Sequence, residues 1–88
     1  MRYKLEISSN LYKKFKKLEK KNKNQLKAIN KKVKRILEKP YHFKPLKGDM
    51  KGLRRVHIGS FVLVYEIKEN IKTVRLLDFE HHDKVYQL

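Results

Sequence analysis

Apolar and polar positions divide the start of the chain into a strand and a helix. From residue 2 to residue 7 the two kinds alternate, which predicts a half-buried strand. Ser8, Ser9 and Asn10 follow, and all three are favourable helix N-cap residues. The apolar period then lengthens, so we expect a helix that ends near Lys21. The residues of its apolar stripe are Leu11, Phe15 and Leu18.

A second apolar stripe predicts a second helix directly after the first. The intervening segment, residues 22–24, is polar and offers Asn24 as an N-cap. Pro40 follows Lys39 and would end the helix, because proline disfavours a helical backbone in the residue before it. A link this short favours an antiparallel hairpin, which we place at residues 10–39. The second stripe consists of Leu26, Ile29, Val33, Ile36 and Leu37.

The second half of the chain changes to an apolar period of two residues. Residues 40–52 hold two prolines and two of the three glycines, so we expect them to form a loop. Val56 and Ile58 then alternate with Arg55 and His57, as in a strand with one buried face.

Two short turns divide the residues that follow into further strands. The Gly-Ser pair at residues 59–60 fits a two-residue hairpin turn with glycine first. The next five residues, 61–65, are all apolar, which predicts a central strand covered on both faces. A second tight turn is expected at the Glu-Asn pair of residues 69–70. Residues 72–79 then form the third strand of a meander.

These elements predict an α+β fold with the order β-α-α-β-β-β. The helical hairpin at residues 10–39 should pack on one face of a small antiparallel sheet, because each has an apolar side that needs a partner. The 88 residues suffice for one domain. Within it the meander covers residues 53–79, and a short tail or helix covers residues 80–88.

Basic residues dominate the charge of the chain and concentrate in the predicted hairpin. Twenty-four Lys and Arg against nine Asp and Glu give a net charge of +15. Residues 1–39 contain fifteen basic and three acidic residues and so carry 12 of these charges. A field of this sign attracts polyanions, so we expect a nucleic acid or an acidic protein as partner. The alternative is that the lysines only form the solvated faces of the helices.

Two absences from the sequence narrow the class of protein. The chain lacks Cys, which excludes a disulfide framework and thiolate metal sites. It has no apolar run near the roughly 20 residues of a membrane span, and no apolar signal-peptide region at its start. We therefore expect a cytoplasmic location and no membrane association.

Basic and histidine side chains are expected to gather on the sheet face away from the helices. Because they alternate with Val56 and Ile58, Arg55 and His57 should share that face. The tail leaves the last strand and can return over the same face. It would bring His81, His82 and Tyr86, while the segment at the start of the meander would bring Lys47, Lys51 and Arg54.

This set of side chains suits cleavage of an RNA backbone without a metal ion. The RNA 2′-hydroxyl attacks the neighbouring phosphate, so the protein supplies proton transfer and charge stabilisation instead of a nucleophile. Histidine transfers protons near neutral pH, an Arg fork binds phosphoryl oxygens, and Tyr stacks on a base. No cofactor is expected. Adjacent His81 and His82 point in different directions in a regular helix or strand, so we also expect no metal site.

The order of elements and two segments together resemble the RelE/ParE toxin superfamily, and its RelE-type mRNA interferases in particular. The segments are LKGDMKGLRRVHIGSFVLVYEI, beginning at Leu46, and LLDFEHHDKVY, beginning at Leu76. The resemblance implies a RelE-like fold and the toxin of a type II toxin–antitoxin pair, which cleaves mRNA in the ribosomal A site. It also implies a RelB-type antitoxin that neutralises the toxin in a higher-order hetero-oligomer.

Position by position, the resemblance implies a role for each candidate residue. Arg55 would bind the scissile phosphate, and Tyr86 would stack on the substrate or orient it. His57 and His82 would share the general acid and general base roles, with His81 as a neighbouring candidate. Contacts to the RNA backbone would fall to Lys47, Lys51 and Arg54.

Two positions depart from the Arg-using members of the superfamily. Those members often carry Arg after the aromatic residue that opens the middle strand and again at the start of the tail, where this chain has Val62 and Glu80. A histidine-based mechanism fits this departure. Two alternatives stay open: a ParE-like toxin that poisons a DNA topoisomerase without nuclease activity, and a weakened or inactive RelE homologue that binds only RNA and antitoxin.

Overall fold

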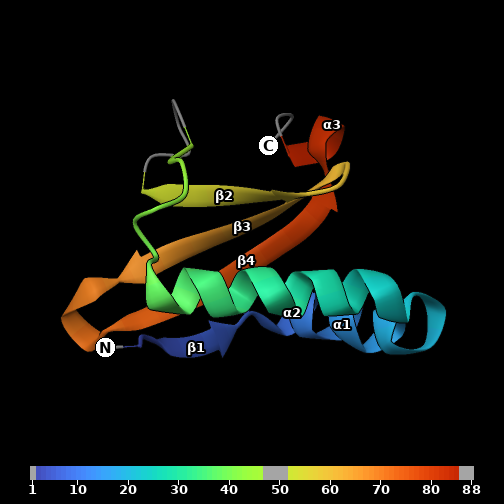
Figure 1. Cartoon of the computed structure of the whole chain (residues 1–88), viewed down its shortest axis with the longest axis horizontal. Coiled ribbons are helices and arrows are strands. Elements are labelled where there is room, and N and C mark those ends of the chain that lie inside the picture. Colours follow the sequence, from blue (N-terminus) through green and yellow to red (C-terminus); the bar gives the residue numbers. More distant parts are fainter. Residues whose placement is uncertain (1, 47–51, 86–88) are drawn as a thin grey trace.

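The computed structural model describes residues 2–46 and 52–85, and it confirms the predicted α+β order (Figure 1). Two long helices form a hairpin near the start of the chain, and a short helix follows the last strand. The elements in chain order are β1 (Lys4–Ile7), α1 (Ser9–Lys21), α2 (Lys23–Glu38), β2 (Leu53–Ile58), β3 (Phe61–Lys68), the 3-10 turn η2 (Glu69–Ile71), β4 (Thr73–His81) and α3 (His82–Val85).

The four strands form one mixed sheet in the order β1-β4-β3-β2. The meander β2-β3-β4 is antiparallel, as predicted. The expectation of a wholly antiparallel sheet is wrong, because β1 pairs with β4 in the parallel sense, from Lys4 opposite Thr73 to Ile7 opposite Leu76. The helical hairpin carries the chain from one edge of the sheet to the other, so β1 meets the last strand and not the next one.

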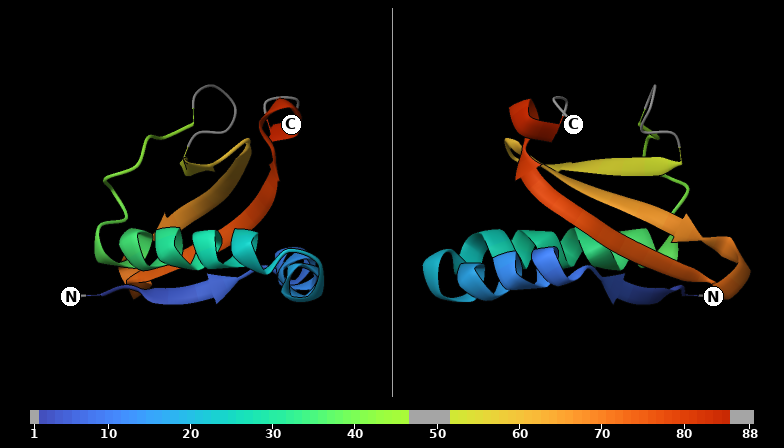
Figure 2. Two further views of the ribbon diagram at one scale, coloured as in Figure 1. Left: turned by 45° about the vertical axis from the view of Figure 1, so that its right-hand side comes forward. Right: turned by 180° about the vertical axis from the view of Figure 1, so that it is seen from behind.

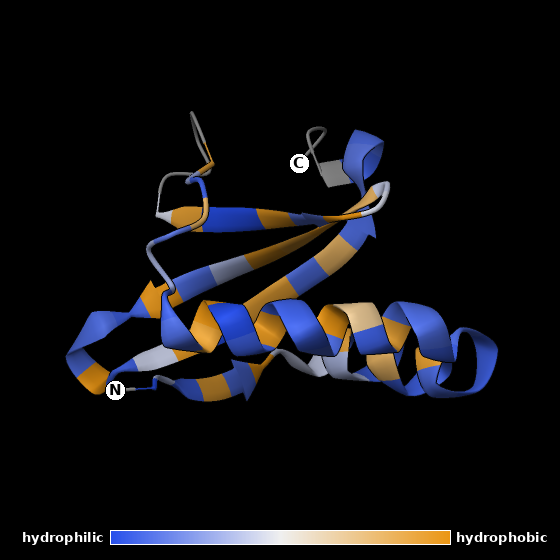
Figure 3. Ribbon diagram, viewed as in Figure 1, coloured by the Kyte–Doolittle hydropathy of each residue, from blue (hydrophilic) through white to orange (hydrophobic). Residues whose placement is uncertain are grey.

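The hairpin covers one face of the sheet, and α3 lies beyond the end of β4, away from the hairpin (Figures 1 and 2). Apolar and polar bands alternate along α2 (Figure 3), and its four buried residues belong to the core against the sheet. Both predicted stripes contribute to this core, which confirms the helical periods. Its buried residues are Leu11, Ile29, Val33, Ile36, Leu37, Val56, Ile58, Leu63, Tyr65, Val74, Leu76 and Phe79.

The first strand is more exposed than its alternating pattern predicts. Leu5 and Ile7 keep 43% and 37% of their surface accessible. The reason is position, because β1 is an edge strand of only four residues that pairs with β4 alone. The predicted strand is thus confirmed, and its predicted half-burial is wrong.

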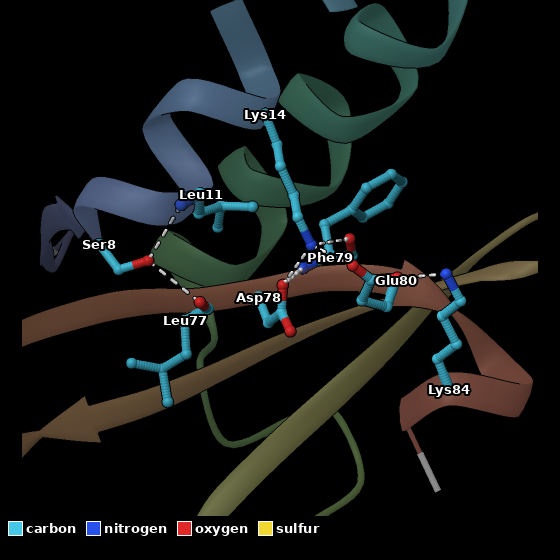
Figure 4. Close-up of polar contacts among 8 residues, drawn as sticks. All are labelled: Ser8, Leu11, Lys14, Leu77, Asp78, Phe79, Glu80 and Lys84. Atoms are coloured by element: carbon cyan, nitrogen blue, oxygen red, sulfur yellow. Dashed lines mark hydrogen bonds and ion pairs between the residues drawn. The ribbon is translucent and has the colours of Figure 1, made fainter. Parts of the chain in front are cut away.

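Side-chain caps fix the start of each long helix. Ser8 is the N-cap of α1: its Oγ accepts a hydrogen bond from the Leu11 N–H at 3.3 Å and donates one to the Leu77 carbonyl at 3.0 Å (Figure 4). The N-cap of α2 is Asn22, whose side chain accepts from the Gln25 N–H at 3.1 Å. The predicted cap Asn24 lies inside α2 instead, because one residue suffices as the link between the helices.

One of the two predicted hairpin turns has the expected length. Residues 59–60 connect β2 to β3, and Gly59 has a φ of 64°, a conformation that glycine adopts without strain. The second connection is longer than the predicted pair at residues 69–70. It consists of the 3-10 turn and Lys72, whose φ is 48°, so that β4 runs over Thr73–His81 instead of residues 72–79.

The Glu69 carboxylate organises this longer turn. Its Oε1 accepts hydrogen bonds from the hydroxyls of Tyr3 at 2.8 Å and Tyr41 at 2.7 Å, and its Oε2 contacts the Lys72 ammonium. One carboxylate therefore joins the start of the chain, the segment after α2 and the β3–β4 connection. The hydrogen bonds from Lys72 and the two tyrosines lower the pKa of Glu69 from 4.5 to about 2.

A second, smaller apolar cluster lies on the other face of the sheet. Val62 and Val64 of β3 are buried there against Leu46, with Leu53 and Leu77 beside them. The central strand is thus covered on both faces, as predicted.

The segment after α2 runs along the outer edge of β2. The Leu46 N–H donates to the Leu53 carbonyl at 2.8 Å, and the Arg55 N–H donates to the Lys44 carbonyl at 3.1 Å. Its start is held by Tyr65, whose hydroxyl donates to the Pro40 carbonyl at 2.6 Å. Burial raises the pKa of Tyr65 to about 12.

Within the part of the chain that the structure describes, no helix is both long and apolar enough to cross a bilayer.

Replacing Tyr65 with Phe should destabilise the fold by about 1–3 kcal/mol, because the buried Pro40 carbonyl would lose its donor. Urea unfolding measures this difference in the free energy of unfolding. Tyr12→Phe is the matched control, since Tyr12 is 47% exposed. Equal losses in the two variants would contradict the assigned role of the Tyr65 hydroxyl.

Replacing Glu69 with Gln should lower stability at neutral pH and much less in acid. The folded-state pKa of Glu69, about 2, lies below its ordinary value of 4.5, so its stabilisation is complete above about pH 4.5 and is lost as the pH falls toward 2. The difference in Tm between wild type and variant should narrow over that window. Glu19→Gln, on exposed helix surface, is the control, and a difference that is constant with pH would refute the linkage.

Candidate functional site

Arg55 and His57 form a close pair on β2, on the sheet face away from the hairpin. Their neighbours along the strand, Val56 and Ile58, are buried in the main core, so the pleat directs the pair to the other side. Nη1 of Arg55 lies 2.6 Å from Nε2 of His57. A guanidinium has only donors, so Nε2 accepts the hydrogen bond in this contact. The predicted juxtaposition of these two residues is confirmed.

Arg54 projects to the opposite side of β2 from this pair. Its Nη1 donates to the Phe43 carbonyl at 2.7 Å and lies 3.4 Å from the Tyr41 carbonyl, and the guanidinium stands 5.1 Å from the Tyr41 ring centre. These contacts fasten the segment after α2 to β2. Arg54 therefore has a structural role. Its predicted contact with RNA stays a prediction.

His81 and His82 lie together where β4 ends and α3 begins. Their ring centres are 4.4 Å apart, and both rings approach the carboxylate of Asp83. The expectation that the two rings diverge is therefore wrong. It assumed a regular helix or strand through both residues, whereas the chain changes from strand to helix between them.

Contacts from two elements hold the His rings at this end of the sheet. The His82 N–H donates to the Ser60 carbonyl at 3.0 Å, and Nδ1 of His82 lies 3.1 Å from the same oxygen. His81 meets the ring of Phe61 edge-on at 5.7 Å, and Phe61 in turn stacks on Phe79. The hairpin turn between β2 and β3 therefore positions the start of α3.

Strand register explains which candidates share a face. His57 pairs with Val62, and Val62 pairs with Glu80, so these three residues form one row across β2, β3 and β4. His81 pairs with Phe61 and has the opposite orientation in the pleat. The predicted convergence of every histidine on one face is thus wrong for His81. His57 lies on one side of the β2–β3 turn, and His81 and His82 lie on the other, at the same end of the sheet.

Val62 and Glu80, which stand where the Arg-using members often carry Arg, both have structural roles in this fold. Val62 is fully buried in the second apolar cluster. Glu80 contacts the ammonium of Lys14, which also donates to Asp78 Oδ1 at 2.8 Å and to the Phe79 carbonyl at 3.2 Å (Figure 4). Partial burial lowers the pKa of Lys14, but the bonds to Asp78 and Glu80 outweigh it and raise the pKa overall. Glu80 thus joins α1 to β4.

Three predicted site residues, Lys47, Lys51 and Tyr86, lie outside the described residues, and their roles stay predictions. Asp83 and Ser60 were missed by the sequence reasoning. The adjacency of Asp83 to two histidines was a usable signal, whereas the contact of Ser60 with His82 depends on strand register.

The described groups can bind a phosphate and move protons. Arg55 offers a planar set of donors to phosphoryl oxygens, and His57 and His82 each present a ring that can accept or give a proton. His81, His82 and Asp83 are also the residues that could hold a metal ion, since one ligand atom from each lies within 4.8 Å of the others.

Comparisons with known proteins agree with this architecture. A family model described as the ParE toxin of type II toxin–antitoxin systems, parDE, matches residues 5–86. The chain is 52% identical over 85 residues to a protein of Methanosarcina mazei, covering 96% of this chain and 99% of that one. It is 46% identical over 86 residues to a Methanocaldococcus jannaschii protein named "Putative toxin RelE4", covering 97% and 92%.

A solved structure shows the same fold at low sequence identity. The toxin–antitoxin complex RelBE2 of Mycobacterium tuberculosis contains a chain that superposes with a TM-score of 0.79 at 22% identity, covering 92% of this chain and 99% of that one. The family match, the two relatives and the shared fold lead to one conclusion. This chain belongs to the ParE toxin family, within the RelE/ParE superfamily of type II toxin–antitoxin toxins.

Proposed function

We propose that this toxin is a ribosome-dependent endoribonuclease that cleaves mRNA in the A site without a metal ion. The observation that carries the proposal is the pairing of Arg55 and His57, 2.6 Å apart on the sheet face away from the hairpin. A phosphate ligand and a proton-transfer group are thereby held side by side on a rigid strand. His82, fixed by the Ser60 carbonyl at the same end of the sheet, supplies a second imidazole.

The cleavage uses the RNA's own nucleophile. A base takes the proton from the 2′-hydroxyl, the 2′-oxygen attacks phosphorus, and the bond from phosphorus to the 5′-oxygen breaks as an acid protonates that oxygen. The products are a 2′,3′-cyclic phosphate and a 5′-hydroxyl. His57 and His82 take the acid and base roles, with His81 as a further candidate, and Arg55 stabilises charge on the phosphoryl oxygens.

Register supports a histidine-based version of this chemistry. In the row His57, Val62 and Glu80, the middle residue is buried and the third is held by Lys14. The basic member of this row is His57, next to Arg55. Tyr86 is proposed to stack on a base, and Lys47 and Lys51 to contact the RNA backbone.

The partners follow from charge and from the family. A net charge of +15, concentrated in the hairpin, favours encounter with ribosomal RNA and mRNA. The Mycobacterium tuberculosis relative is a toxin–antitoxin complex, and we extend this to a RelB-type antitoxin for the present chain, in a higher-order hetero-oligomer. An acidic chain that folds on binding would neutralise the basic surface. Such an activity would operate in the cytoplasm, where mRNA is translated.

The second candidate is a toxin that poisons a DNA topoisomerase by binding it. The observation in its favour is the match to a ParE family model across residues 5–86. A third candidate is a homologue that binds RNA and antitoxin but does not cleave, and Val62 and Glu80 favour that reading.

Substitutions of His57, His82 and Arg55 should separate these candidate functions. His57→Gln and His82→Gln should each slow mRNA cleavage by about 10²–10⁴-fold, because each removes a proton-transfer group. Arg55→Ala should slow it by about 10²–10³-fold, because it removes donors to the transition-state charge. His42→Gln is the control, since His42 lies in the segment after α2 and packs edge-on against Phe43. Circular dichroism checks folding, and full cleavage by all three site variants would refute the assignment.

Primer extension on mRNA loaded into ribosomes tests the reaction itself. We expect cuts within the A-site codon that require the ribosome and persist in EDTA. Growth arrest with intact mRNA and a DNA-damage response would support the topoisomerase poison. Neither cuts nor arrest, with RNA binding that weakens steeply as salt rises, would support the inactive homologue.

A further inference from the structure

The junction of β4 and α3 brings three side chains with metal-binding chemistry into one cluster. Nε2 of His82 lies 3.0 Å from Oδ1 of Asp83, and Nδ1 of His81 lies 3.6 Å from Oδ2 of the same residue. One ligand atom from each of the three lies within 4.8 Å of the other two. A carboxylate oxygen only accepts, so the contact between Nε2 of His82 and Asp83 needs either a proton or a metal ion between the two atoms.

Neighbouring groups already orient the His82 ring for a ligand role. A carbonyl oxygen only accepts hydrogen bonds, so the contact between Nδ1 of His82 and the Ser60 carbonyl places a proton on Nδ1. Nε2 faces Oδ1 of Asp83, and a metal ion that binds here takes the place of the proton that otherwise joins these two atoms. Metal-binding histidines characteristically donate their second nitrogen to a carbonyl or carboxylate in this way, which fixes both the tautomer and the ring plane.

The His81 ring is also held in place. Its edge contact with Phe61, itself stacked on Phe79, ties it to the margin of the main core. The backbone N–H of Asp83 donates a hydrogen bond to Nδ1 of His81 at 3.3 Å, and a metal ion that binds Nδ1 takes the place of this bond. The cluster therefore consists of two oriented rings and one exposed carboxylate that can rotate.

The ligand set and its spacing select a class of metal. Two imidazoles and a carboxylate suit zinc and the neighbouring transition ions, whereas calcium and magnesium prefer oxygen ligands alone. In a tetrahedral zinc site with bonds of about 2.0–2.1 Å the ligand atoms are about 3.3 Å apart. The distances from Asp83 oxygens to Nε2 of His82 and Nδ1 of His81, 3.0 and 3.6 Å, are close to that spacing. Three protein ligands leave the fourth position to water.

We propose that His81, His82 and Asp83 form a binding site for a zinc-class divalent ion, and that its occupation inhibits the toxin. Inhibition follows because the metal takes the lone pair of His82 that proton transfer requires. This second step rests on the proposed nuclease function, whereas the binding step does not. The net charge of +15 repels cations in general, so binding here depends on the ligands and not on the overall field.

Calorimetric titration of zinc chloride into the purified, untagged chain tests the binding step. We expect one equivalent to bind and to raise Tm, because the ion binds the folded state. Asp83→Asn and His81→Gln should each weaken binding at least tenfold. His42→Gln should leave it unchanged, and magnesium chloride should give no saturable heat. The absence of saturable zinc binding, or equal binding in Asp83→Asn and wild type, would overturn the proposed site.

Ribosome-dependent cleavage with and without zinc tests the inhibition step. Zinc at the concentration that saturates the calorimetric site should stop cleavage by wild type, and EDTA should restore it. Asp83→Asn, compared with its own metal-free rate, should be insensitive to zinc. Equal wild-type cleavage with and without bound zinc would overturn the inhibition. A chain that binds zinc but never cleaves would refute the nuclease function and the inhibition with it, and leave the metal site standing.

Discussion

Burial of β3 on both faces is the constraint on which the rest of the structure depends. Leu63 and Tyr65 face the hairpin core, and Val62 and Val64 face the smaller cluster under Leu46. A strand covered in this way has to pair on both edges, because unpaired backbone groups are costly to bury. It therefore fixes the register of β2 and β4. Arg55 and His57 lie on β2, and His81 and His82 lie where β4 passes into α3, so the positions of these four residues depend on β3.

Local patterns predicted most of the fold because the elements are locally consistent. Both helical stripes, the Gly59 turn and the apolar run of the central strand follow from side-chain period and turn chemistry. The errors arose where partners distant in sequence decide. The parallel pairing of β1 is set by the path of the hairpin. Glu69 holds the longer β3–β4 connection by its hydrogen bonds with Tyr3 and Tyr41, which lie 66 and 28 residues away from it along the chain.

The candidate site was predictable to the extent that it follows from alternation. The Arg55–His57 pair needs only the pleat of one strand, and the structure brings these two side chains into contact. Arg54 is basic but projects to the opposite face of the sheet. The carbonyl groups that it contacts belong to a loop, whose path the apolar periodicity of the sequence does not predict. The meeting of His81 with His82 required the chain to change from strand to helix between them, and a uniform period cannot predict that change.

The parallel contact between β1 and β4 also governs when the protein can fold during synthesis. β1 leaves the ribosome first, but its partner residues, Thr73 to Leu76, are made almost seventy positions later. Until β4 emerges, β1 lacks the strand with which it pairs, and the sheet face under the hairpin is incomplete. Contacts this distant in sequence also form slowly. A nascent chain therefore cannot complete its sheet until β4 has been made.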